Sequence, residues 1–314
     1  MNAPQLDATV IVLSYQARHR IHTALDALRR QDSEARYEVL VVDSGTDGCD
    51  TYVRERYPEA TVLHSPKRLR PGPARNLGID QARGRIIAFL PDDGLPRRDW
   101  LRRRLALHQN GYDAVGGAIT NGLPDSYVAR ANHLLEYSSL LPHDAILRAQ
   151  AIPHCLSFAR HVFTRLGRYP EDTLTGEDTL FNRRCVETGI SFAFSAEIQM
   201  AHVGLTSFSG TLRHAARHGR GLMQCTRRHQ LGSAFGDPET LWSAVWRCLV
   251  TYPAGGVFAK AQRFRRYAPE RLPGLIGGLP VIVPALVATG AGALIEWRNG
   301  DDAGARPLNA TSAS

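Results

Sequence analysis

Two adjacent carboxylates follow a short apolar run in the first third of the chain. Residues 86–90 have the length and composition of a buried strand, and Asp92 and Asp93 come at its carboxyl end. Open α/β sheets bind ligands at that end of their strands. Mg²⁺ and Mn²⁺ prefer carboxylate oxygens and complete their coordination with substrate phosphates. The pair therefore predicts a site for a divalent cation and a phosphorylated ligand, with a polar turn before a helix starting near Pro96 as the alternative.

A second acidic pair, Glu177 and Asp178, precedes a helical stretch. A carboxylate held at a helix start and partly desolvated by substrate can act as a general base toward an acceptor hydroxyl. Acidic residues also occur at helix starts simply because they stabilise the helix N-terminus. From these residues alone, both roles stay open.

The elements that must position these groups alternate between strands and helices. Predicted strands cover residues 8–13, 37–42, 60–64 and 86–90, with helical patterns between them. Parallel strands joined by helical crossovers bring the loops at their carboxyl ends to one edge of a sheet. The sequence therefore predicts an α/β fold in which Ser14, Asp43 and Asp93 converge.

The net charge and the cysteine content of the chain restrict the kinds of partner and the cellular compartment that we expect. The 314 residues carry a net charge of +8, which suits nucleic acid, an anionic membrane surface or phosphorylated small molecules. No helix-turn-helix, zinc or RNA-recognition motif accompanies the charge, so we do not expect a nucleic-acid partner. The five cysteines are scattered without a Cys-x-x-Cys pair, which predicts free thiols in a reducing compartment. The N-terminus lacks a basic-then-apolar leader, so secretion is not expected.

Several short motifs, taken in order, resemble those of the family 2 glycosyltransferases of the GT-A fold. They occupy residues 9–15, 38–47, 74–78, 89–93 and 176–178, and the resemblance covers about residues 8–205. It implies a Rossmann-like, mixed but mainly parallel sheet flanked by helices. It further implies a nucleotide-sugar half over about residues 1–95 and an acceptor half over residues 96–205. The implied activity is that of an inverting hexosyltransferase using a nucleotide-diphosphate sugar, with a UDP-sugar as the first expectation.

The resemblance also assigns substrate-binding positions. Asp43 takes the position that contacts the nucleotide base, and Ser14 and Tyr15 flank the nucleotide. Arg75 lies where the family often has a basic nucleotide contact, and Asp92 is expected to bind substrate.

The implied metal site departs from the family pattern. Pro91 stands at the first acidic position of the metal motif, which leaves Asp93 as the expected direct ligand of Mg²⁺ or Mn²⁺. His202 is the second expected metal ligand, and a core histidine is the alternative. Ser44 replaces an acidic residue, and Gln16 replaces an asparagine, that are common in the family.

The same resemblance implies roles in catalysis for the second acidic pair, Glu177 and Asp178. Asp178 matches the family's general base, and Glu177 beside it is expected to orient the substrate or the helix. A catalytically silent GT-A domain that binds sugar nucleotides or recruits partners at a membrane is the alternative. Pro91 favours this alternative, whereas Glu177 and Asp178 oppose it.

The region 206–298 is predicted to be helical, basic and apolar, and associated with a membrane. Residues 272–295 contain no charged side chain and are long enough to span a bilayer, while residues 241–258 look interfacial. Basic residues before the apolar run predict a location on the cytoplasmic face of the inner cell membrane. A packed helical appendage is the alternative. Residues 299–314 are polar and expected to be disordered.

A basic stretch opens this region, and its role stays open between a diphosphate clamp, an anionic lipid contact and a solvated face. It contains Arg213, His214, Arg217, His218, Arg220, Arg227, Arg228 and His229. A membrane-bound enzyme of this kind predicts a glycan or lipid-linked acceptor, such as a cell-surface polysaccharide intermediate.

Overall fold

The computed structural model describes residues 6–142, 156–230, 235–236 and 238–304. Cys155, one of the five scattered cysteines, lies outside these ranges. The described chain forms an eight-stranded sheet in the order β3-β2-β1-β4-β7-β6-β8-β5. The strands are β1 (Ala8–Ser14), β2 (Tyr37–Asp43), β3 (Thr61–His64), β4 (Ile86–Pro91), β5 (Gly94–Pro96), β6 (Ala114–Asn121), β7 (Ser157–Ala159) and β8 (Phe192–His202).

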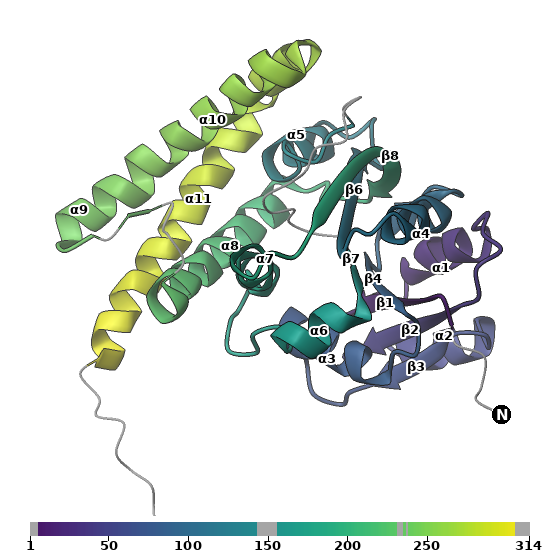
Figure 1. Ribbon diagram of the computed structural model, residues 1–314. Coiled ribbons are helices and arrows are strands. Elements are labelled where there is room, and N and C mark those ends of the chain that lie inside the picture. Colours follow the sequence, from purple (N-terminus) through teal and green to yellow (C-terminus); the bar gives the residue numbers. More distant parts are fainter. Residues whose placement is uncertain (1–5, 143–155, 231–234, 237, 305–314) are drawn as a thin grey trace, which may run out of the picture.

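The first four strands pair in parallel, as the alternating pattern predicts. Strands β1, β2 and β4 are runs of mainly β-branched and apolar side chains that are largely buried, which suits a parallel sheet covered by helices, whereas Thr61 and His64 of the edge strand β3 are exposed. Strand β7 runs antiparallel to β4 and β6, and β5 runs antiparallel to β8. The mixed, mainly parallel sheet flanked by helices confirms the expected fold class (Figure 1).

Helices cover both faces of the sheet (Figure 1). They are α1 (Ile21–Arg29), α2 (Cys49–Arg56), α3 (Pro71–Gln81), α4 (Trp100–Gln109), α5 (Tyr127–Glu136), α6 (Arg160–Leu166), α7 (Glu177–Glu187) and α8 (Phe208–His229). The predicted apolar face of α1 is buried through Ile21, Leu25 and Leu28. Helix α3 starts with Pro71, whose fixed φ and missing N–H suit a first helical turn.

The pairing of β5 with β8 matters most for the position of the polar residues. Gly94 lies opposite His202 in this pairing, and Asn121 lies opposite His202 in the parallel pairing of β6 with β8. The end of β8 is thus inserted between the loop after β4 and the end of β6. This arrangement brings His202 beside Asp93.

The C-terminal helices pack on the sheet domain as a hairpin. They are α9 (Leu241–Trp246), the π-helical turn η1 (Arg247–Thr251), α10 (Tyr252–Tyr267), the 3-10 turn η2 (Pro269–Arg271) and α11 (Leu272–Gly304). Figure 1 shows α11 between α10 and α8, with α5 against its first turns. Helix α11 continues past residue 299, because each added residue gains a backbone hydrogen bond once a helix is nucleated. The predicted disorder is therefore wrong as far as Gly304, and residues 305–314 lie outside the described chain.

Close contact between backbones holds α11 against α8. A Cβ on Gly219 would lie 1.8 Å from the carbonyl oxygen of Thr289, and one on Gly292 would lie 1.9 Å from that of Ala216. Among the described residues, α11 and its flanks (Pro269–Asn299) form the one segment with the length and composition of a membrane span, and half of its most apolar window is buried. A buried core helix has the same composition, so membrane insertion of α11 stays a prediction.

Candidate functional site

The carboxyl ends of β1 and β2 form the expected nucleotide end of the site. Ser14 and Asp43 are partners in the strand register, and the Ser14 hydroxyl donates to Oδ1 of Asp43 at 2.8 Å. His64, at the end of β3, places Nδ1 3.0 Å from Oδ2 of Asp43. The carboxylate of Asp43 is fully buried. The predicted convergence of Ser14 and Asp43 is confirmed, whereas His64 had not been expected.

A further group of possible metal ligands surrounds the same carboxylate. Asp43, Asp50 and His64 each offer a ligand atom within 4.8 Å of the others. Both oxygens of Asp43 already have hydrogen-bond partners, so a cation here would compete with the Ser14 and His64 contacts. Asp50 carries no signal in the sequence beyond its place in the first turn of α2.

Asp92 is held by an arginine that sequence reasoning missed. Arg20 donates from Nε to Oδ1 at 2.9 Å and from Nη2 to Oδ2 at 3.0 Å, a bidentate pair. Burial raises the pKa of Asp92, although the Arg20 hydrogen bond opposes the shift. The backbone N–H of Tyr15 lies 3.4 Å from Oδ2 of Asp92. Asp92 therefore ties the loop after β4 to the loop after β1.

The ring of Tyr15 lies at the surface of this region. It is 39% exposed, and the guanidinium of Arg68 lies over it at 4.2 Å from the ring centroid. An exposed aromatic ring with a cation beside it can stack on a planar base and counter phosphate charge. This geometry suits the expected position of Tyr15 next to the nucleotide.

Asp93 and His202, the two expected metal ligands, face each other. Nε2 of His202 lies 3.4 Å from Oδ1 of Asp93, and both side chains keep partial access to solvent. The ring of Tyr137 packs 5.2 Å from the His202 ring, centroid to centroid, and limits its freedom. A carboxylate oxygen and an imidazole nitrogen in this arrangement are a donor set that suits Mn²⁺ or a similar divalent ion.

The acidic pair Glu177 and Asp178 begins α7 and is buried, with 4% and 9% exposure. Gly176, immediately before them, adopts a left-handed conformation with φ of 86°, which a glycine adopts without strain. Oδ1 of Asp178 accepts a 2.7 Å hydrogen bond from the backbone N–H of Thr179. The helix start therefore gives the Asp178 carboxylate a fixed orientation.

Arg75 pairs with Glu177 in the same buried region. Its guanidinium forms an ion pair with Glu177 and lies near the rings of Phe89 and Tyr169, at 5.7 and 5.3 Å from their centroids. Burial by itself would lower the pKa of Arg75, but the surrounding charges, with Glu177 first, and the hydrogen bond to Glu177 together outweigh burial, so the pKa is raised. Arg75 thus remains a cation that holds Glu177, and its expected contact with the nucleotide stays a prediction.

Helix α8 packs against the loop that immediately precedes this acidic pair. The Cys225 thiol donates to the carbonyl oxygen of Thr175 at 3.2 Å. A Cβ on Gly221 would lie 1.9 Å from Oγ1 of Thr175. Small residues on α8 thus let the loop before α7 approach the helix closely, which fixes where Glu177 and Asp178 stand.

Several cations of the basic stretch have protein partners. Arg220 pairs with Glu296, Arg228 donates to the Asp172 carbonyl oxygen at 2.7 Å, and Arg227 donates to that of Trp297. These contacts fasten α8 to α11 and to the loop before α7. Part of the basic stretch therefore has a structural role.

Comparisons with known proteins agree with this geometry. The model of the family described as "Glycosyl transferase family 2" matches residues 9–167, about half of the chain. Glycosyltransferase AglE of Haloferax volcanii is 28% identical over 223 residues, which cover 69% of this chain and 73% of that protein.

Two solved structures share the fold. The mannosyltransferase PcManGT from Pyrobaculum calidifontis, solved with GDP-Man and Mn²⁺, superposes with a TM-score of 0.61 at 22% identity over 93% of this chain and 91% of its own. TarS residues 1–349 of S. aureus, solved with UDP-GlcNAc, gives a TM-score of 0.53 at 15% identity over 94% and 92% of the two chains. At these identities, the likeness establishes the GT-A fold.

Proposed function

The chain belongs to glycosyl transferase family 2 and is a glycosyltransferase enzyme, and we propose that it is a metal-dependent, inverting hexosyltransferase. Its donor is a nucleotide-diphosphate sugar, and UDP- and GDP-sugars are the first to test because fold relatives were solved with UDP-GlcNAc and GDP-Man. Its acceptor is a hydroxyl-bearing glycan or lipid-linked intermediate at the cytoplasmic face of the cell membrane. The observation that carries the proposal is the Asp93–His202 pair, at the sheet edge where Ser14 and Asp43 meet.

The donor is bound at the carboxyl ends of β1, β2 and β4. The Tyr15 ring stacks on the base, and the base edge reaches Oδ2 of Asp43 by displacing the partly exposed His64 ring from it. Asp93 and His202 hold a divalent ion, which supplies positive charge to the leaving diphosphate when it is bound. Arg20 keeps Asp92 in place, so the two loops around the nucleotide stay together.

The acceptor is activated at the start of α7. Asp178 takes the proton of the acceptor hydroxyl while the hydroxyl oxygen bonds to the anomeric carbon. The bond from that carbon to the diphosphate oxygen breaks, and the nucleoside diphosphate leaves with the electron pair. Attack opposite the leaving group inverts the anomeric configuration. The Arg75–Glu177 pair holds the first turn of α7 and so positions Asp178.

A panel of nucleotide sugars with Mn²⁺ or Mg²⁺ tests the proposal. Diphosphate release is measured with detergent-solubilised protein, with and without a membrane lipid extract, for the wild type, Asp178→Asn and Glu187→Gln. Glu187 is an exposed carboxylate on the same helix that pairs with Arg183, so it is the matched control. We expect Asp178→Asn to lower turnover by about 10²- to 10⁴-fold while donor binding is retained.

Two other outcomes would contradict the proposal. Equal loss of donor binding and turnover in Asp178→Asn would argue against a general base. If the wild type binds donors but releases diphosphate from none of them, the result would favour the catalytically silent GT-A domain. Pro91 in the metal motif is the feature that favours that alternative. The anomeric configuration of the product, read by NMR, decides between inversion and retention.

A further inference from the structure

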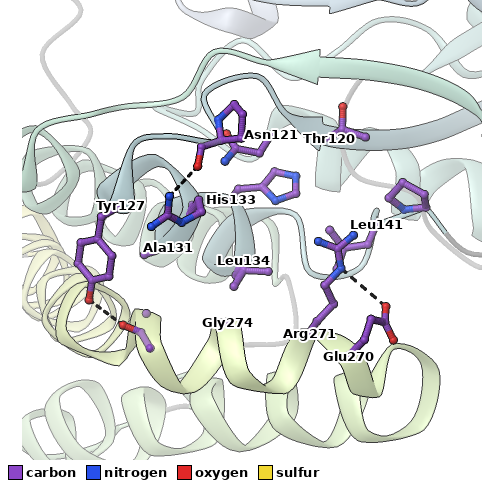
Figure 2. Close-up of a pocket in the computed structure, with 15 residues that line it drawn as sticks. Thr120, Asn121, Tyr127, Ala131, His133, Leu134, Leu141, Glu270, Arg271 and Gly274 are labelled. Carbon is purple, nitrogen blue, oxygen red and sulfur yellow. Dashed lines mark hydrogen bonds and ion pairs between the residues drawn. The ribbon is translucent and has the colours of Figure 1, made fainter.

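A cavity of about 530 Å³ lies between α5, the end of β6, η2 and the first turns of α11. Figure 2 shows α5 above and α11 below, with Leu134 pointing into the space between them and His133 lying higher, toward β6. Its volume falls in the range of small-molecule sites. The lower wall is formed by Gly274, Gly277 and Gly278 of α11, which leave room that larger side chains would fill.

The interior of this cavity is apolar and uncharged. Ala131, Leu134 and Leu141 line it and belong to the buried cluster shared by α5, α10 and α11. Burial lowers the pKa of His133, and its Nε2 lies 2.9 Å from the Ile119 carbonyl oxygen, so the imidazole is neutral at pH 7 and satisfied. Such a lining suits a hydrocarbon chain.

The charged groups lie in the exposed part of the lining. Arg130 is exposed, and its Nη1 donates to the carbonyl oxygen of Pro124 at 2.6 Å. Arg271 is about half exposed and forms a loose 3.7 Å ion pair with Glu270. Two arginines against one carboxylate leave a net positive charge.

The cavity is next to the expected reaction centre. Asn121 lines it and lies opposite His202 in the β6–β8 register. Packed rings also connect the cavity lining to His202. The His133 ring lies 5.8 Å from the Tyr137 ring, and the Tyr137 ring lies 5.2 Å from the His202 ring, centroid to centroid. One layer of residues therefore separates the cavity from a predicted metal ligand.

We propose that this cavity binds the isoprenoid chain of a glycan acceptor linked to polyprenyl phosphate, with the phosphate at Arg271 and Arg130 and the sugar hydroxyl left free to accept. The proposal deepens the proposed function, on which it rests, by naming the lipid class. A cavity of this volume accepts a segment of one branched chain rather than the two acyl chains of a glycerophospholipid. A phosphate held at the arginines leaves the glycan that it carries on the side of the cavity next to Asn121, which lies opposite His202 in the β6–β8 register.

Farnesyl phosphate is a short, soluble probe of this chemistry. Its binding is measured by calorimetry without donor or metal, so that the result does not depend on turnover. The variants are Gly274→Leu, which fills the cavity, and Arg271→Gln, which removes the cation. A Cβ on Gly274 would lie 3.4 Å from Cδ1 of Leu134, an ordinary contact, and the rest of the leucine side chain would extend into the cavity.

Matched controls lie on α10, outside the cavity lining. A Cβ on Gly255 meets nothing within 4 Å, so Gly255→Leu adds the same bulk in open space, and Arg265→Gln removes an exposed cation. We expect Gly274→Leu and Arg271→Gln each to weaken farnesyl phosphate binding about tenfold or more, and the controls to leave it within about twofold. Asp178→Asn should bind the probe like the wild type, which separates this test from that of the proposed transferase mechanism.

Three further ligands decide which part of the probe is recognised. Farnesol should bind more weakly than farnesyl phosphate and be insensitive to Arg271→Gln, and inorganic phosphate alone should not bind measurably. Equal binding of dihexanoyl phosphatidylglycerol with the same sensitivity to Gly274→Leu would overturn the isoprenoid assignment. Absence of farnesyl phosphate binding, or equal binding by all variants, would overturn the proposal entirely.

Discussion

Nε2 of His202 and Oδ1 of Asp93 lie 3.4 Å apart. They are close because β5, which begins directly after Asp93, pairs with the end of β8 at His202. The contact joins the nucleotide half of the chain to the end of the acceptor half. Any ion held here depends on both halves being folded together.

Removal of either ligand should weaken metal binding. We expect Asp93→Asn and His202→Ala to raise the Mn²⁺ concentration for half-maximal diphosphate release by about 10- to 100-fold. His161→Ala is the control, because His161 is an exposed histidine on α6 paired with Asp113. A normal Mn²⁺ dependence in both site variants would exclude this pair as the metal site, and the same titration of Asp50→Asn would then examine the Asp43 group.

The contact between α8 and the loop before α7 should affect turnover. Gly221→Ala would place a Cβ 1.9 Å from Oγ1 of Thr175, so the loop that carries Glu177 and Asp178 must shift. We expect a loss of stability of about 1–3 kcal/mol and a fall in kcat larger than the change in donor KM. Gly255→Ala on α10, where the Cβ meets nothing within 4 Å, should stabilise slightly or not at all. Unchanged kcat in Gly221→Ala would show that the loop does not depend on this contact.

His108 should make stability depend on pH. Burial lowers the pKa of its imidazole to about 4, so below the ordinary value of 6.5 the unfolded chain binds a proton that the folded chain does not. The free energy of unfolding therefore rises with pH between about 4 and 6.5 and falls as the solution is acidified through that window. The full contribution across this window is on the order of 3 kcal/mol, from about 2.5 pKa units at about 1.36 kcal/mol each.

The contribution of His108 to the pH dependence of stability is measured by urea unfolding of His108→Gln at pH 4.5 and at pH 7. Nδ1 of His108 lies 2.8 Å from the Tyr112 carbonyl oxygen and Nε2 lies 2.9 Å from the Ser157 hydroxyl, and Gln can replace one of these contacts without titrating. The difference in stability between the two pH values should be smaller in His108→Gln than in the wild type or in His19→Gln, a variant of an exposed histidine. An identical difference in all three proteins would contradict the prediction.

Exposed aromatic residues of α9 should contribute to membrane binding. Trp242 and Trp246 are 76% and 51% exposed, and Phe258 on α10 is 63% exposed. Tryptophan is favoured at the membrane interface, so co-sedimentation with phosphatidylglycerol vesicles should fall in a Trp242→Asp, Trp246→Asp double variant. Val186→Asp changes an exposed apolar residue of α7 and should pellet like the wild type. Equal pelleting of all three proteins would contradict a role for α9.

Local sequence patterns were enough to predict the first half of the sheet and the residue types of the site. The four β-branched runs ending in polar loops predicted β1 to β4 to within a residue or so, because local period, length and composition decide such strands. The convergence of Ser14 and Asp43 followed from the same argument, because parallel strands end on one edge. The motif order identified the family, which the comparisons confirm.

Which of these residues come into contact depends on how the chain folds in three dimensions. The Arg20–Asp92 and Arg75–Glu177 pairs, and the contact of Asp93 with His202, join residues far apart in the sequence, and no local pattern encodes such pairs. The three-residue strand β5 is too short to show a period, yet it sets the register that brings His202 to Asp93. The charge-free run of α11 fits a membrane span and a buried helix equally well by composition. Its packing against α8 depends on where Gly219 and Gly292 meet facing carbonyl groups, which is a property of the folded chain.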